Sequence, residues 1–131
     1  MKELLQRFVD LEKALSEERG GVSLFALFLR EDAVDKWDLV LAAPWINGDR
    51  KGALSYVTKK LQETFTPDEM SLISRIVLID LENPAVEAVN QAVAIRHGQA
   101  EVRDSNFFGL QIKHAYIIHS ERRKLNERIV A

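Results

Sequence analysis

Few folds are open to this chain, because it contains three short apolar segments: residues 22–30, 37–43 and 74–80. The first and the third are apolar at both alternating positions, which predicts strands that are buried on both faces. All three are far shorter than the roughly 20 residues that a membrane-crossing helix needs. They therefore predict the inner strands of a sheet that helices cover.

Amphipathic segments predict the covering helices. Residues 2–18 repeat apolar side chains about every 3.6 residues, and Gly20 and Gly21 end that helix. The start signals of three further helices are Asp49, Thr66 with Glu69 as a capping box, and Asn83 before Pro84. The helix from Asp49 is expected to reach about residue 65, and the helix from Asn83 about residue 96.

The last part of the chain predicts two more strands, at residues 99–104 and 110–120, and a terminal helix in the tail 121–131. A polar link at 31–36 predicts a hairpin between the first two strands, whereas the helix between the second and third strands predicts a parallel crossover. The expected fold is α+β, with a mixed sheet of about five strands and helices packed on it. Residues 1–131 are expected to form a single domain.

Composition excludes several kinds of site. The chain has no cysteine, which rules out disulfides, thiolate zinc sites, iron–sulfur clusters and cysteine nucleophiles. Its formal net charge is −2, which does not suit a general binder of polyanions. The N-terminal segment carries frequent charges and no continuous apolar core, so no signal peptide is expected. We therefore expect a cytoplasmic protein without a membrane span.

Histidine is scarce, and the three histidines all lie late in the chain: His97, His114 and His119. A metal site needs two of them on one face, but His114 and His119 are five residues apart, which on a regular strand puts them on opposite faces. The spacing therefore disfavours a metal site, and no metal ligands are predicted. His114 falls on an apolar strand face, where it is either a general acid or base or a hydrogen-bonded core residue.

Two aspartates and a lysine are the other candidates for catalysis. Asp38 begins an apolar strand, and Asp80 ends one, at the kind of sheet edge where α/β proteins bind ligands. Lys113, on the last strand, is a candidate for proton transfer or charge stabilisation. Both aspartates also have structural interpretations: Asp38 as the ion-pair partner of Lys36 or Arg30, and Asp80 as a helix-capping acid.

Aromatic and basic residues indicate possible surfaces. Trp45 lies in a predicted loop, and Phe107 and Phe108 lie in the turn between the last two strands. Large apolar side chains in loops either anchor a partner or fold back onto the core. Arg122 and Arg123 belong to a basic tail that lacks an aromatic residue for stacking on bases, so a solvated helix face is preferred to a nucleic-acid interface.

Two function hypotheses remain, and neither comes with a recognisable cofactor, because the chain has no phosphate loop and no serine-nucleophile motif. The first is a small interaction or ligand-binding module that associates with itself as a homodimer and has no catalytic activity. The alternative is a small metal-dependent enzyme that acts on nucleotides or nucleic acid through Asp38, Asp80 and His114, with Lys113 assisting.

Overall fold

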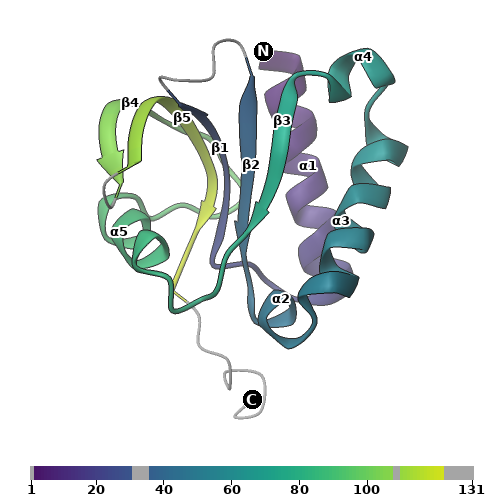
Figure 1. Ribbon diagram of the computed structural model, residues 1–131, viewed down its shortest axis with the longest axis horizontal. Helices are drawn as coiled ribbons and strands as arrows, with labels where there is room; N and C mark the ends of the chain where they lie inside the picture. Colours follow the sequence, from purple (N-terminus) through teal and green to yellow (C-terminus); the bar gives the residue numbers. More distant parts are fainter. Residues whose placement is uncertain (1, 31–35, 108–109, 123–131) are drawn as a thin grey trace.

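The computed structural model describes residues 2–30, 36–107 and 110–122. In chain order the elements are α1 (Lys2–Arg19), β1 (Leu24–Arg30), β2 (Trp37–Ala42), α2 (Pro44–Gly48), α3 (Arg50–Thr64), α4 (Pro67–Met70), β3 (Ile73–Leu78), α5 (Pro84–Ala92), β4 (Ala100–Phe107) and β5 (Leu110–Ser120). Figure 1 shows them as one twisted sheet with helices on both sides. Among the described residues, no helix combines the length and the apolar character that crossing a membrane requires.

All five strands belong to one mixed sheet, in the order β3-β2-β1-β5-β4. β1 lies at the centre and is antiparallel to β2 and β5, and β4 is antiparallel to β5. β2 and β3 are parallel, since α2, α3 and α4 return the chain to the same end of the sheet between them. The predicted α+β fold with a mixed five-stranded sheet is confirmed, and the three apolar segments correspond to β1, β2 and β3. The prediction that residues 74–80 form an inner strand buried on both faces is wrong, because β3 is an edge strand with only one neighbour and its residues are exposed or partly buried.

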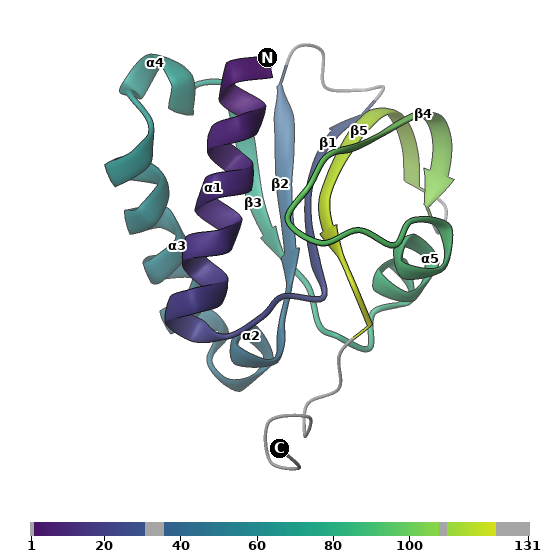
Figure 2. The same ribbon diagram turned by 180° about the vertical axis from the view of Figure 1, so that it is seen from behind.

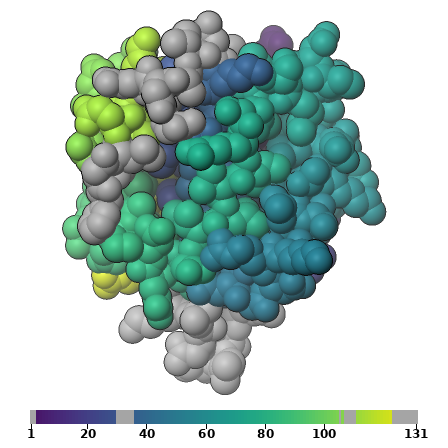
Figure 3. Space-filling view, in the orientation of Figure 1, coloured from purple at the N-terminus to yellow at the C-terminus, as the bar shows by residue number. Residues whose placement is uncertain are grey.

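Alternation along β1 directs its side chains into two separate cores. Phe25 and Leu27 pack with residues of α1 and α3, while Leu24 and Ala26 pack with residues of α5 on the opposite face. Figure 2 shows α1 and α3 side by side on one face of the sheet, and Figure 1 shows α5 in front of the other. β3 and α5 form part of the outer surface seen in Figure 3.

Hydrogen bonds confirm two of the predicted helix starts. The Asp49 side chain accepts from the N–H of Gly52 at 2.9 Å, and the Asn83 side chain accepts from the N–H of Ala85 at 2.8 Å. These bonds satisfy backbone donors that the first turns of α3 and α5 leave without an intrahelical partner. The start signals are therefore local and readable from the sequence.

The segment after α5 differs from the prediction. The predicted helix reaches about residue 96, but α5 ends at Ala92 and Ile95 forms a bridge with Ser120. The last residues of β5, which lie beyond its pairing with β4, explain this change, because Ile95 and Ser120 exchange two backbone hydrogen bonds, of 3.2 and 2.8 Å, that a longer helix would forgo. β4 is also longer than predicted and continues through Phe107.

The loop predicted at Trp45 is instead the short helix α2. Pro44 begins this helix, where a fixed φ and a missing N–H are no disadvantage. Most of the predicted hairpin link at 31–36 and of the predicted tail helix at 121–131 lies outside the described residues, which omit 31–35 and 123–131.

α4 begins with the predicted capping box. Thr66 Oγ1 accepts from the N–H of Glu69 at 3.2 Å, and Glu69 Oε1 accepts from the N–H of Thr66 at 2.8 Å. Arg7 of α1 donates to both carboxylate oxygens of Glu69 and so connects α1 to α4. The hydrogen bonds from Arg7 and then from Thr66 lower the pKa of Glu69 from its ordinary 4.5 to about 2.

We expect Glu69 to make unfolding pH-dependent in a defined window. Because its pKa is lower in the folded state, its contribution to stability is fully present above the ordinary pKa of 4.5 and is lost as the pH falls through about 2. The urea midpoints of the unmodified protein and of Glu69→Gln should therefore differ at pH 6 and converge toward pH 2. The exposed Glu63→Gln serves as control, and a difference that stays constant with pH would contradict the expectation.

Candidate metal site

Three ionisable side chains from distant parts of the chain meet on the α1 side of the sheet: Glu12 of α1, His97 of the segment between α5 and β4, and His119 of β5. Each offers one ligand atom, and these atoms all lie within 4.8 Å of one another. In Figure 2 the segment that joins α5 to β4 crosses in front of β5, toward α1. We refer to these three residues as the Glu–His–His cluster.

Glu12 lies on the buried face of α1. It follows Phe8 by four residues and precedes Leu15 by three, and the helix therefore places all three side chains on one face. Glu12 and Leu15 are both 0% exposed. An ionised carboxylate at such a position needs partners, because burying an unpaired charge is strongly unfavourable.

A bulge turns His119 toward α1. The register between β1 and β5 shifts after Phe25, so that Phe25 is opposite His119 while Ala26 is opposite Ile117. His119 therefore lies on the same side of the sheet as Phe25, and its side chain is buried. The prediction that His114 and His119 lie on opposite faces is wrong, because the extra residue in β5 reverses the alternation between them.

His97 reaches the cluster from the edge of the sheet. Its φ is 46°, in the left-handed region that residues with a side chain seldom adopt. A hydrogen bond to β5 fixes the position of the next residue, Gly98, since its N–H donates to the carbonyl of Ile118 at 2.9 Å. The His97 and His119 rings are 4.9 Å apart, and the His97 side chain is 39% exposed, which gives the cluster its access to solvent.

Glu12 is the centre of a hydrogen-bond network. Its Oε1 lies 2.5 Å from Nδ1 of His97, and its Oε2 accepts from Ser16 Oγ at 2.6 Å and lies 3.5 Å from Nδ1 of His119. Burial raises the pKa of Glu12, but its polar contacts with His119, Ser16 and His97 outweigh the effect of burial and hold the pKa below its ordinary value. At neutral pH the cluster thus contains an ionised carboxylate.

The ligand set suits a divalent transition metal. Neutral imidazole nitrogen binds zinc, iron, nickel and copper, and two histidines with one carboxylate form a common three-ligand set with a position left for water. Zinc at about 2.1 Å from each ligand holds the ligand atoms about 3.4 Å apart. The atoms of the cluster, within 4.8 Å of one another, reach this spacing through small side-chain movements.

The structure does not bring together the two predicted carboxylates. Asp38 is buried at the start of β2, where Arg75 of β3 contacts it at 3.1 Å. Asp80 follows the end of β3, five residues beyond Arg75, which at the rise of a strand corresponds to about 16 Å. Asp80 is exposed and forms an ion pair with Arg50 of α3.

His114 is separated from Asp38 by the sheet. Asp38 belongs to the face of β2 that alternation directs toward α5, whereas His114 packs on the other face against the rings of Trp37 and Tyr116, at 5.5 and 4.7 Å. Nε2 of His114 lies 3.0 Å from a carboxylate oxygen of Glu101. Lys113, its neighbour in the chain, is exposed, so these residues form no common cleft with the two aspartates.

The structure describes only some of the aromatic residues that were predicted to form a partner surface. Trp45 folds back onto the core formed with α1 and α3, and its Nε1 donates to the carbonyl of Gly20 at 3.1 Å. Phe107 is the last residue of β4, and Phe108 and Arg123 lie outside the described residues. Self-association stays a prediction, since no described contact tests it.

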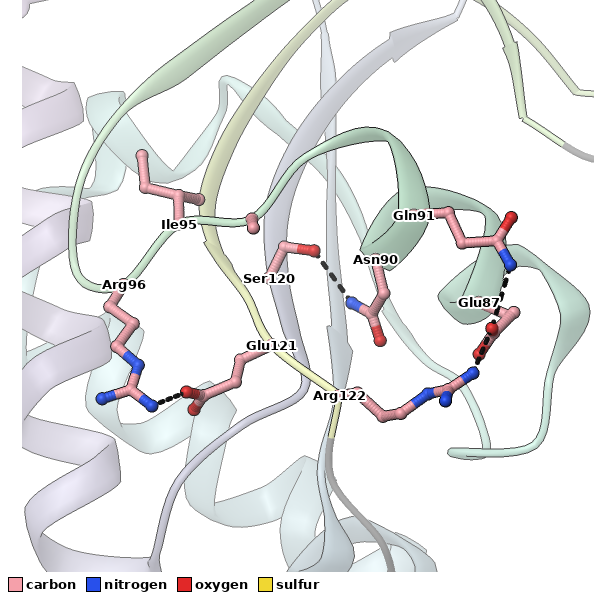
Figure 4. Close-up of a pocket in the computed structure, with 9 residues that line it drawn as sticks. Glu87, Asn90, Gln91, Ile95, Arg96, Ser120, Glu121 and Arg122 are labelled. Carbon is pink, nitrogen blue, oxygen red and sulfur yellow. Dashed lines mark hydrogen bonds and ion pairs between the residues drawn. The ribbon is translucent and has the colours of Figure 1, made fainter.

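Arg122 lines a cavity of about 600 Å³ between α5 and the end of β5. Figure 4 shows two ion pairs on opposite sides of it, one between Arg96 and Glu121 and one between Arg122 and Glu87. A contact of Arg122 with a nucleic-acid phosphate would therefore have to compete with its pairing to Glu87.

Sequence reasoning placed none of the three cluster residues in a candidate site, and it did not single out Glu12 at all. Glu12 carries a readable signal, because it is an acid four residues after Phe8 inside the apolar stripe of α1. His97 carries none, since the sequence predicts it as the stop of a helix and does not reveal that the segment turns back to pair with β5.

The chain matches no protein-family model, no curated protein and no solved structure. Its function therefore has to be inferred from its own side chains. Among the described residues, the Glu–His–His cluster is the one group of three or more potential metal ligands that converge.

Proposed function

We propose that the protein is a ligand-binding module and that its ligand is a divalent transition-metal ion held by Glu12, His97 and His119. The observation that carries the proposal is a fully buried carboxylate whose two oxygens each lie close to an imidazole nitrogen. The mixture of imidazole and carboxylate favours zinc or iron(II) over magnesium or calcium, which prefer oxygen ligands alone.

A purely structural hydrogen-bond network is the competing explanation of the same geometry. It accounts for Glu12, whose partners are Ser16 and His97, but it leaves Nε2 of His119 buried without a hydrogen bond among the described residues. A metal on the opposite ring nitrogen gives this histidine a function, because a ligating imidazole is polarised and becomes a better donor through its other nitrogen. For His97 to bind the ion through Nδ1, the hydrogen that this nitrogen shares with Glu12 has to move to Nε2 of the same ring.

Isothermal titration of the chelator-treated protein with zinc at pH 7 tests the proposal. We expect one zinc per chain, and a loss of affinity of more than about 100-fold in Glu12→Gln and in His97→Ala, because outer-shell partners alone change metal affinity by about 10–100-fold. His114→Gln is the matched control, since His114 also contacts a glutamate but lies outside the cluster. An unmodified protein that takes up no zinc, iron(II) or nickel would contradict the proposal.

A further inference from the structure

We propose that Glu121 is a positioning residue of this metal site: when the ion is bound, Glu121 accepts a hydrogen bond from the Nε2–H of His119, so that His119 presents Nδ1 to the ion. The inference rests on the proposed function and deepens it, because it names which nitrogen binds and which residue outside the cluster controls that nitrogen. It also connects the metal site to the cavity beside α5, since Glu121 lines that cavity.

The His119 ring lies between two carboxylates. Its Nδ1 is 3.5 Å from Oε2 of Glu12, and its Nε2 is 3.6 Å from Oε1 of Glu121. The side chain is only 2% exposed, so water contributes little to the choice of tautomer. Each ring nitrogen therefore faces a carboxylate, one from Glu12 and one from Glu121, and the protein itself decides which nitrogen carries the proton.

A backbone hydrogen bond identifies the tautomer. The N–H of His97 donates to Nδ1 of His119 at 3.4 Å, which requires a lone pair on Nδ1. A neutral imidazole has one N–H and one lone pair, so the proton is on Nε2, the nitrogen that faces Glu121. This is the tautomer that a metal needs for ligation through Nδ1, because the lone pair already points into the cluster.

Glu121 is itself held in place. Its carboxylate forms an ion pair with Arg96, the residue directly before His97 in the chain. Its separation of 3.6 Å from Nε2 is slightly longer than a hydrogen bond, and it shortens when a metal withdraws electron density from the ring and strengthens the N–H donor. Figure 4 shows the Arg96–Glu121 pair on one side of the cavity.

The opposite side of the cavity supplies a matched control. Glu87 and Arg122 form an ion pair of the same type, and both carboxylates line the same cavity, but Glu87 contacts no histidine in the described part of the chain. A substitution of Glu87 changes the charge of the cavity as much as a substitution of Glu121 does. Only the latter removes the acceptor that faces His119.

Zinc titrations of Glu121→Gln and Glu87→Gln, with the unmodified protein alongside, provide the first test. We expect Glu121→Gln to weaken zinc binding by about 10–100-fold, the usual effect of losing an outer-shell carboxylate, and Glu87→Gln to change it by less than about twofold. Thermal unfolding of both metal-free variants shows whether either substitution has altered the fold.

Nitrogen-15 NMR of the histidine rings shows which nitrogen binds the metal and how fast the Nε2 hydrogen exchanges. A merely structural role of Glu121 would leave both unchanged. In the zinc-bound unmodified protein and in Glu87→Gln, we expect His119 to show a metal-bound Nδ1 and a protonated Nε2 whose hydrogen exchanges slowly. In Glu121→Gln that exchange should be faster.

Three outcomes would overturn the inference in distinguishable ways. Equal zinc affinities for the two variants, or ligation of His119 through Nε2, would reject the role of Glu121 and leave metal binding by the cluster intact. Absence of metal binding by the unmodified protein would reject both the inference and the proposed function.

Discussion

Replacing Phe25 by alanine is expected to lower the free energy of unfolding by about 3–5 kcal/mol. Phe25 is 0% exposed and belongs to β1, the strand at the centre of the sheet. Its side chain packs with residues of α1 and α3, so its removal leaves a cavity between the sheet and the helices as well as losing apolar burial. A loss of this size is a large share of the 5–15 kcal/mol that typically stabilises a domain.

Urea unfolding followed by circular dichroism measures this change. Leu54→Ala is the control, because Leu54 is 43% exposed on α3 and alanine is a good helix former, so we expect a change within about 0.5 kcal/mol. A loss below about 1 kcal/mol for Phe25→Ala would contradict the placement of β1 between two helical layers.

Zinc is expected to raise the melting temperature of the unmodified protein by about 10 °C. An ion present at 100 times its Kd and bound only by the folded state contributes about 2.7 kcal/mol. An unfolding entropy of about 2.1 cal/mol/K per residue converts this into the expected shift for a chain of 131 residues. The ligands come from α1, from the segment before β4 and from β5, so the unfolded chain offers no comparable site.

Differential scanning fluorimetry with and without zinc, and again after addition of a chelator, measures this shift. Each variant is compared with its own metal-free form, because the substitutions change the starting stability as well. His114→Gln should keep the full shift, and Glu12→Gln should lose it. A shift below about 2 °C in the unmodified protein, or an equal shift in Glu12→Gln, would count against binding at the cluster.

The strands and the helix starts were predictable because their signals are local. A segment that is apolar at both alternating positions, such as residues 22–30, can be satisfied only between two covering layers. Asp49 and Asn83 cap α3 and α5 through hydrogen bonds that span two or three residues. Neither signal requires knowledge of what lies elsewhere in the chain.

The candidate site was not predictable, because it depends on register and on contacts between distant residues. The face on which His119 lies is decided by a bulge opposite Phe25, and the sequence does not reveal where a strand gains an extra residue. Glu12 and His97 are 85 positions apart. Their meeting depends on the pairing of Ile95 with Ser120, which replaces the end of a predicted helix.

The two predicted carboxylates lie apart for a related reason. Asp38 and Asp80 both flank apolar strands, and the sequence correctly indicates that those strands are parallel neighbours. Asp38 is near the start of β2, however, while Asp80 follows the end of β3, so that parallel pairing places them at opposite ends of the sheet. In an antiparallel pair, the start of one strand lies beside the end of the other, and such a pair would have placed the two aspartates close together.

The three cluster residues come from elements that are far apart in the chain, and this affects how the folded protein unfolds. α1 is the first described element and β5 the last, and Glu12 and His119 connect them across the face of the sheet. A bound ion would therefore oppose separation of the first helix from the final strand, and detachment of that helix would release the ion. Occupancy of the site would then report whether both ends of the molecule are docked.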